Sequence, residues 1–293
     1  MSTVVAIGNF DGVHLGHQRV LKEAALEHEE PLVVITFWPH PMSVLRPDKA
    51  PKLLGDLTTR IELLKAAGAH EVRVVQFTEA VAQLSPREFV ERFVFPLQPT
   101  RVVVGENFRF GHRAAGDVAE LARLGAGHFE VVHLALESIN DMVTCSTLIR
   151  ACLAEGDVAC AAEHLGRPFR VRGVVVMGDQ RGRELGYPTA NLPVPADLAV
   201  PADGVYAGWL MATDGVRLPA AISVGSNPTF NGVDRRVESY VLDRTDLELY
   251  GEEIVVDFVD RLRGQVKFDG IEGLIAQMDQ DIDQCRRVLG VAE

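Results

Sequence analysis

Short apolar runs alternate with longer helical patterns through the first half of the chain. The segments between the runs, such as residues 57–67 and 86–95, are long enough to form crossover helices. Alternating strands and helices predict a parallel sheet that carries helices on both faces. The expected strands are residues 4–7, 31–37, 72–77, 101–105 and 130–134.

Three loops follow these expected strands, at residues 8–17, 39–41 and 105–111. The carboxyl ends of parallel strands meet at one edge of the sheet, and the ligands of such folds bind there. We therefore expect the three loops to converge on one site.

The pattern changes beyond residue 166, where short apolar runs are separated by turns rich in glycine and proline. This pattern is typical of a small antiparallel barrel or sandwich. We place the domain boundary between residues 166 and 167, which gives domains 1–166 and 167–293. The expected strands are residues 169–177, 204–211, 220–224, 236–242 and 253–258.

The chain ends in a helical pattern with one apolar face along its whole length. We expect this helix to pack against the second domain. Its apolar positions are Ile271, Leu274, Ile275, Met278, Ile282, Cys285 and Leu289.

Charge and composition narrow the class of partner. The formal net charge of −12 argues against a nucleic-acid or anionic membrane surface as partner, because those surfaces attract a basic face. No run of apolar residues is long enough to span a bilayer, and the first residues lack the basic segment of a signal peptide. The four cysteines form no CxxC pair, so we expect reduced thiols and a cytoplasmic protein.

The first loop has the features of a phosphate site. A strand, a turn containing Gly8 and Gly12, and a helix start bring backbone N–H groups toward an anion. His14 and His17 are three residues apart, so both imidazoles would lie on one face near the positive end of the helix dipole. The loop matches neither GxGxxG nor a Walker A motif. Two alternatives are a zinc site, for which further ligands are missing, and an ordinary polar helix face.

Two further segments carry candidate chemistry. In residues 105–111, Asn107 could read a nucleotide base while an aromatic ring stacks on it, although the phenylalanines could instead fill the core. In residues 144–150, two hydroxyls precede a helix and Arg150 lies one turn inside it. This set could grip the β- and γ-phosphates of a nucleotide as pyrophosphate leaves, or the hydroxyls could simply cap the helix.

Together these segments resemble the adenylyltransferase module of the bacterial bifunctional riboflavin kinase/FMN adenylyltransferases, also called FAD synthetases. The resemblance rests on the His-x-Gly-His of residues 14–17 and on residues 36–40, 107–111 and 145–150. It implies a nucleotidyltransferase fold in which a phosphate attacks the α-phosphorus of ATP and expels pyrophosphate. Cys145 stands where the family more usually has serine.

The resemblance also implies roles for individual residues of this module. His14 and His17 would stabilise the phosphates, and Asn107 would help to hold the nucleotide. Ser146, Thr147 and Arg150 would grip the triphosphate. The loop positions assigned to the nucleotide are Gly8, Phe10, Asp11 and Gly12.

The run from Gly178 to Asn191 resembles the riboflavin kinase signature of the same family, with Pro-Thr-Ala-Asn at its core. Glycines allow the backbone to approach phosphates closely, and Thr189 and Asn191 supply neutral oxygens suited to Mg²⁺. A glycine-rich hairpin would explain the glycines but not these oxygens. The residues assigned to phosphate binding are Gly178, Arg181, Gly182 and Gly186.

Glu238 matches the catalytic base of the kinase family, which takes the proton of the riboflavin 5′-hydroxyl. Without the resemblance, a glutamate that alternates with apolar residues on a strand would be read as a solvated position. Residues 223–230 and 262–268 extend the match, and we expect them to form loops around the flavin.

The expected fold is therefore an α/β nucleotidyltransferase domain (Rossmann-like, parallel sheet), followed by a small antiparallel β-barrel domain and a C-terminal helix. The resemblance implies two reactions, riboflavin to FMN and FMN to FAD, with ATP as co-substrate and Mg²⁺ as cofactor. The expected partners are riboflavin, FMN, FAD and ATP, and a homo-oligomer is one option for the assembly. The alternatives are a nucleotidyltransferase for another acceptor, such as phosphopantetheine, and a flavin-binding protein without catalysis.

Overall fold

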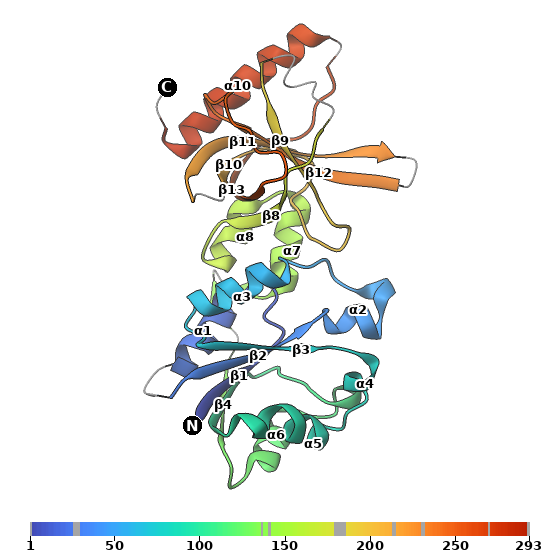
Figure 1. The fold of residues 1–293 in the computed structure, drawn as a ribbon, viewed down its shortest axis with the longest axis vertical. Coiled ribbons are helices and arrows are strands. Elements are labelled where there is room, and N and C mark those ends of the chain that lie inside the picture. The colour runs from blue at the N-terminus through green and yellow to red at the C-terminus, as the bar shows by residue number, and fades with distance from the viewer. Residues whose placement is uncertain are drawn as a thin grey trace. The chain divides into compact units, whose positions relative to one another are not determined.

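The structure is a computed structural model that describes residues 2–25, 30–135, 137–139, 142–178, 186–212, 215–229, 232–268 and 270–291. The chain divides into two compact units, Met1–Ser146 and Thr147–Glu293 (Figure 1). Helices α7 (Ser146–Glu155) and α8 (Val158–Leu165) precede the expected domain boundary at residue 166, but almost all their residues group with the second unit. The boundary after residue 166 stays a prediction.

The first unit contains a five-stranded sheet in the order β3-β2-β1-β4-β5, and all neighbouring strands are parallel. This confirms the sheet predicted from the alternating apolar runs. The order reverses at β1, which lies between β2 and β4, so the loops after β1 and β4 flank the position where α/β folds bind ligands. The strands are β1 (Thr3–Ile7), β2 (Leu32–Trp38), β3 (Glu71–Gln76), β4 (Pro99–Gly105) and β5 (Glu130–Leu134).

Helices cover both faces of this sheet, as predicted (Figure 1). Alternate strand residues point to opposite faces, so Val4 and Ala6 pack with α1 and α3 while Val5 and Ile7 pack with α5 and α6. The helices of the unit are α1 (Leu15–Ala25), α2 (Pro41–Leu45), α3 (Leu57–Ala66), α4 (Glu79–Ala82), α5 (Pro86–Phe89) and α6 (Val118–Gly125). A short hairpin of β6 (Ser138–Ile139) and β7 (Met142–Val143) precedes α7.

The second unit contains an antiparallel sheet in the order β8-β13-β10-β11-β12-β9. An isolated antiparallel bridge links Val176, two residues beyond the end of β8, to Asn191 on β9, and this arrangement agrees with the expected barrel. The run that begins at Thr189 was not among the expected strands, and it forms one because its backbone pairs with β12. The strands are β8 (Phe169–Val174), β9 (Thr189–Pro193), β10 (Gly204–Met211), β11 (Arg217–Thr229), β12 (Gly232–Val241) and β13 (Glu253–Arg263).

The C-terminal helix α10 (Ile271–Leu289) packs against the barrel, where Ile282 and Cys285 join an apolar cluster. One position of the predicted apolar face is wrong, because Ile271 at the start of the helix is 63% exposed. Asp281 is buried instead, and Arg263 at the end of β13 donates to its carboxylate at 2.7 Å. A buried charge of this kind needs such a partner, which the helical pattern does not reveal.

The prediction of reduced thiols is wrong for two of the four cysteines. Cys152 on α7 and Cys160 on α8 form a disulfide, with their Cα atoms 5.9 Å apart. The turn between the two helices brings together residues that are too far apart in the sequence to form a CxxC pair. Cys145 and Cys285 are free thiols.

No helix in the described ranges is long and apolar enough to cross a membrane.

Candidate functional site

The loops after β1, β4 and β5 surround a cavity of about 390 Å³ at the carboxyl edge of the first sheet. The first and third of the predicted loops therefore do converge. The lining includes Gly8, Phe10, His14, His17, Asn107 and Cys145.

The two histidines lie side by side in this cavity. Their rings stack, with centroids 3.6 Å apart and an angle of 20° between the ring planes. The rings of Phe10 and His17 meet edge to face, with their centroids 5.2 Å apart. Helix α1 begins at Leu15, so His14 precedes the helix rather than lying in its first turn. Its Nδ1 accepts a long hydrogen bond of 3.4 Å from the backbone N–H of His17. His14 is only 6% exposed, so the pair is not an ordinary polar helix face.

Burial lowers the pKa of the His17 imidazole well below its usual value of 6.5, and the nearby positive charges of His14 and Arg60 lower this pKa further. His17 is therefore neutral at pH 7. A neutral imidazole can still donate one hydrogen bond to a phosphate oxygen.

This pKa shift predicts a pH-dependent stability of the first unit. The unfolded chain binds a proton at His17 below about pH 6.5, but the folded chain does not until a lower pH. The free energy of unfolding should therefore fall as the pH drops below that value. We expect the free energy of unfolding of His17→Gln, measured in urea, to fall less between pH 7 and pH 5 than that of the parental chain. His133→Gln, at an exposed position of β5, is the control, and an unchanged pH dependence in His17→Gln would contradict the prediction.

The loop that carries His14 has an unusual backbone. Phe10 and Val13 have positive φ angles of 52° and 42°, which cost about 1–3 kcal/mol each outside glycine. Gly12 has a φ of 79°, a conformation that glycine adopts freely. Such a conformation persists only where the surrounding bonds impose it.

Asp11 supplies part of that support and does not line the cavity. Its side chain is buried, and Oδ1 accepts from the backbone N–H of Leu54 at 3.0 Å and from Arg60 at 3.3 Å. Gly12 lies against Leu54, also away from the cavity lining. The structure therefore places these two predicted nucleotide-binding residues outside the lining of the cavity.

The hydroxyls of residues 146 and 147 occupy the first two positions of α7, not the positions ahead of it. Ser146 donates from Oγ to the backbone oxygen of Asp11 at 2.9 Å, which connects it to the histidine loop. Thr147 and Arg150 belong to the second unit, and their roles stay predictions.

A second cavity, of about 690 Å³, adjoins the same sheet edge and was not predicted as a pocket. Aromatic residues from the ends of strands line it together with α2, whose Pro41 comes from the second predicted loop. Phe110 both lines this cavity and packs on Phe89 at 5.5 Å, so the core-filling alternative holds for that ring. Arg109 lines both cavities.

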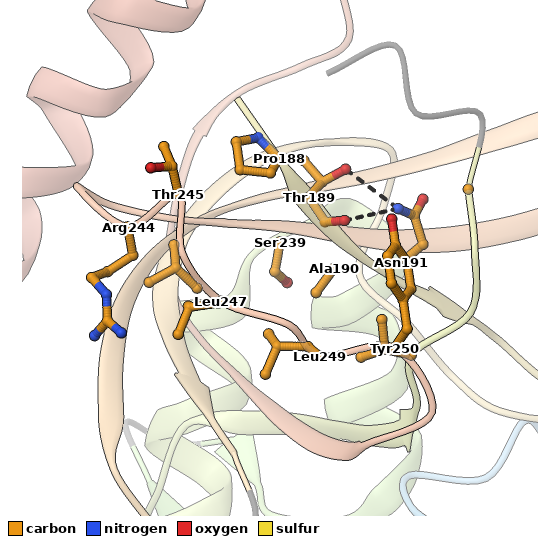
Figure 2. Close-up of a pocket in the computed structure, with 13 residues that line it drawn as sticks. Pro188, Thr189, Ala190, Asn191, Ser239, Arg244, Thr245, Leu247, Leu249 and Tyr250 are labelled. Carbon is orange, nitrogen blue, oxygen red and sulfur yellow. Dashed lines mark hydrogen bonds between the residues drawn. The ribbon is translucent and has the colours of Figure 1, made fainter. Parts of the chain in front are cut away.

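In the second unit, Thr189 and Asn191 line a pocket at the edge of the barrel (Figure 2). The Asn191 amide donates to the Thr189 backbone oxygen at 3.1 Å and to its hydroxyl at 3.3 Å. Gly178 lines the same pocket, whereas Gly186 is exposed with a φ of 89°. Arg181 and Gly182 lie outside the described residues. The segment after β12 also lines this pocket, although no motif in the sequence points to it, and it contributes Arg244, Thr245, Leu247, Leu249 and Tyr250.

Glu238 lines a separate cavity of about 440 Å³, together with Arg236 and Lys267. The register of β12 places Glu238 opposite Asn191 on one side and opposite Ser223 on the other, so these side chains share a face of the sheet. Gln265 also lines the cavity and donates to the Ser223 hydroxyl at 3.2 Å. A half-buried glutamate in a cavity differs from the solvated position that alternation alone would indicate.

Comparisons with known proteins cover both units. A family model described as FAD synthetase matches residues 1–148, and one described as riboflavin kinase matches residues 165–289. Three curated relatives are each named bifunctional riboflavin kinase/FMN adenylyltransferase. The relative from Listeria monocytogenes is 37% identical (98% of this chain, 92% of the relative), that from Bacillus subtilis 34% (97% and 92%) and that from Escherichia coli K12 32% (99% and 94%).

A solved structure from Streptococcus pneumoniae, titled a macrolide-efflux protein, superposes with a TM-score of 0.88. It is 33% identical to this chain, and the match covers 97% of this chain and 94% of the other.

Proposed function

Because the chain belongs to the family of bifunctional riboflavin kinase/FMN adenylyltransferases, we propose that its histidine-lined cavity holds the ATP used to adenylylate FMN. The enzyme phosphorylates riboflavin to FMN with its flavokinase domain and converts FMN to FAD with its FAD synthetase domain. The observation that carries the proposed ATP site is the gathering of His14, His17 and Asn107 around one cavity at the carboxyl edge of the sheet.

In the proposed adenylyl transfer, a phosphate oxygen of FMN attacks the α-phosphorus of ATP. The bond to the leaving pyrophosphate breaks as the new P–O bond forms. Charge builds on the phosphate oxygens, and donors held in place beforehand stabilise it without reorganisation. His14 and His17 are these donors, Asn107 holds the nucleotide, and Ser146 helps to grip the triphosphate.

The second cavity of the first unit is the proposed FMN site. We call it the aromatic cavity because Phe37, Phe77 and Phe110 are among the residues that line it. Phe37 and Phe77 give this cavity an aromatic lining of the kind that suits a flat isoalloxazine, and the volume of about 690 Å³ suits a ligand of this size. Arg109 lines this cavity and the ATP cavity alike. Its guanidinium can hold the FMN phosphate near the α-phosphorus of ATP.

In the proposed kinase reaction, the Glu238 carboxylate takes the proton of the riboflavin 5′-hydroxyl while its oxygen attacks the γ-phosphorus of ATP. The bond between the γ-phosphorus and ADP breaks in the same step, and Glu238 keeps the proton. The position of Glu238 opposite Asn191 supports this role, because Asn191 is a proposed ligand of the Mg²⁺ ion that arrives with ATP.

Thr189 and Asn191 fit a Mg²⁺ ion that arrives with ATP. Both are neutral oxygen donors two residues apart on one strand, and a hydrogen bond from the Asn191 amide to the Thr189 hydroxyl joins the two side chains (Figure 2). When bound, the ion neutralises phosphate charge during transfer. A cytoplasmic location is part of the same proposal, since both reactions consume ATP.

One assay tests the proposal as a whole. Purified protein is incubated with riboflavin, ATP and Mg²⁺, and the flavins are separated by chromatography. We expect FMN to appear first and FAD to follow. FMN without FAD would overturn the proposed adenylylation site, and neither product would leave only the flavin-binding alternative.

Gly178 provides a test of the proposed ATP-binding role of the pocket that it shares with Thr189 and Asn191. A Cβ at this position would lie 2.6 Å from the side-chain Cγ and Oδ1 of Asn191, so Gly178→Ala must displace that amide. We expect the KM for Mg-ATP in the kinase reaction to rise about tenfold, the size of a modest overpacking cost. In the control Gly173→Ala, the new Cβ meets Leu192 at an ordinary 3.5 Å. Equal KM values for the two variants would contradict the prediction.

A further inference from the structure

Arg60 on α3 is 2% exposed, although arginine is rarely buried to this degree. Its guanidinium donates hydrogen bonds to the loop after β1 and to the end of β2. Nη1 donates to the backbone oxygens of Asn9 and Phe37, each at 3.1 Å, and Nη2 donates to Asp11 Oδ1 at 3.3 Å. The same group lies 5.3 Å from the centroid of the Trp38 ring.

These partners belong to the walls of both cavities in the first unit. Asn9 follows β1 and lines the histidine cavity, while Phe37 is the last residue but one of β2 and lines the aromatic cavity. Thr36 donates from its hydroxyl to the same Asn9 oxygen at 2.9 Å. Arg60 and Thr36 therefore hold the histidine loop against the end of β2.

The backbone of the histidine loop explains why these hydrogen bonds are needed. Phe10 and Val13, which flank Asp11 and Gly12, have positive φ angles that side chains other than glycine rarely adopt. The carboxylate of Asp11 and the backbone oxygen of Asn9 fix the start of this stretch. If they were released, the loop could relax and carry His14 away from its stacked position.

Neutralising Asp11 would not require an arginine. A buried ion pair recovers little stability beyond its own desolvation cost, and a single charge could satisfy one carboxylate. The guanidinium instead supplies several donors in a rigid plane, which lets it reach acceptors in two loops at once. Arg60 reaches two segments in this way, because it donates to the backbone oxygen of Asn9 after β1 and to that of Phe37 in β2.

We propose that Arg60 is a positioning residue for adenylyl transfer, which sets the histidine loop and the end of β2 at the separation that brings ATP and FMN together. The inference rests on the proposed placement of the two substrates in the first unit. Arg60 acts through Asn9, Asp11 and Phe37 and touches neither substrate.

The test compares four variants of the full chain, Arg60→Met, Asp11→Asn, the double variant that combines them, and Thr36→Val. For each, kcat and KM are measured for FMN-to-FAD conversion, and riboflavin phosphorylation is measured in the same sample. The kinase rate reports the concentration of active second unit, so FAD formation can be compared at equal amounts of enzyme. Arg87→Met, which removes an exposed ion pair with Glu91 on the same unit, is the matched control.

We expect Arg60→Met to lower the kcat of FAD formation about 100-fold, the effect of misplacing reactants by roughly 1 Å, while KM changes little. Thr36→Val keeps every charge and removes one donor to Asn9, so a loss of about tenfold in kcat is expected at unchanged KM. The kinase rate and the Arg87→Met variant should remain at the parental level. In the double variant, removal of the Asp11 charge should not restore kcat.

Recovery of the double variant to the rate of Asp11→Asn would overturn the proposal, because Arg60 would then serve only as a counterion. Parental kcat in Arg60→Met, or in Thr36→Val if Arg60→Met does not fold, would overturn it as well. Failure of the parental chain itself to form FAD is a different result, since it contradicts the proposed function and not the role of Arg60.

Discussion

Glu238→Gln is expected to stop the enzyme at its first step, with riboflavin phosphorylation about 10²–10⁴-fold slower, the usual contribution of a general base. Glutamine preserves the shape of the side chain and its place opposite Asn191 on the neighbouring strand. It cannot accept the proton of the 5′-hydroxyl, so the attacking oxygen remains a weak nucleophile. FMN supplied from outside should still become FAD, because that reaction belongs to the first unit.

The measurement is a pair of initial rates, one starting from riboflavin and one from FMN. Glu272→Gln, at an exposed position of α10, controls for the loss of a carboxylate from the second unit. If Glu238→Gln phosphorylates riboflavin at the parental rate, Glu238 is not the base. A loss of both reactions would indicate damage to the fold instead.

His14→Ala is expected to block the second reaction, the conversion of FMN to FAD, and to leave riboflavin phosphorylation intact. FMN should accumulate while FAD formation falls about 10²–10³-fold, the effect of removing one preorganised donor to a charged transition state. The substitution removes one member of the imidazole stack and leaves His17 without its neighbour at 3.6 Å. The kinase residues lie in the other unit, so FMN formation should continue at the parental rate.

Chromatography of the flavins formed from riboflavin and ATP gives both rates in a single time course. His133→Ala, at an exposed position of β5, is the matched control for the loss of an imidazole from the first unit. FAD formation at the parental rate in His14→Ala would remove the histidine pair from the proposed mechanism.

Much of the fold was predictable because its signals are local. The central strands of the first sheet are buried on both faces, so each appears in the sequence as an unbroken apolar run. The strand predicted at residues 204–211 has the same first and last residues as the observed strand β10, Gly204–Met211. The strand at Thr189–Pro193 was not expected, because a proline and polar residues dominate that run and only its pairing with β12 makes it a strand.

The candidate site was predictable in part for the same reason. His14 and His17 are three residues apart, so their proximity follows from chain geometry alone. The role of Arg60 could not be found in this way, because Asn9 lies 51 positions away along the chain and α3 shows no local sign of the contact. The disulfide between Cys152 and Cys160 likewise depends on how two helices meet.

By itself, the sequence determined the order of the elements, the resemblance of both halves to one enzyme family and the residue types available for phosphate chemistry. These properties follow from residue spacing and from motifs that are continuous in the chain. Only the tertiary structure decided which loops share a cavity, that Asp11 is turned toward Arg60, and that Glu238 lies opposite Asn191. Each of these depends on contacts between residues that are distant in sequence, and such contacts form only when the sheet assembles.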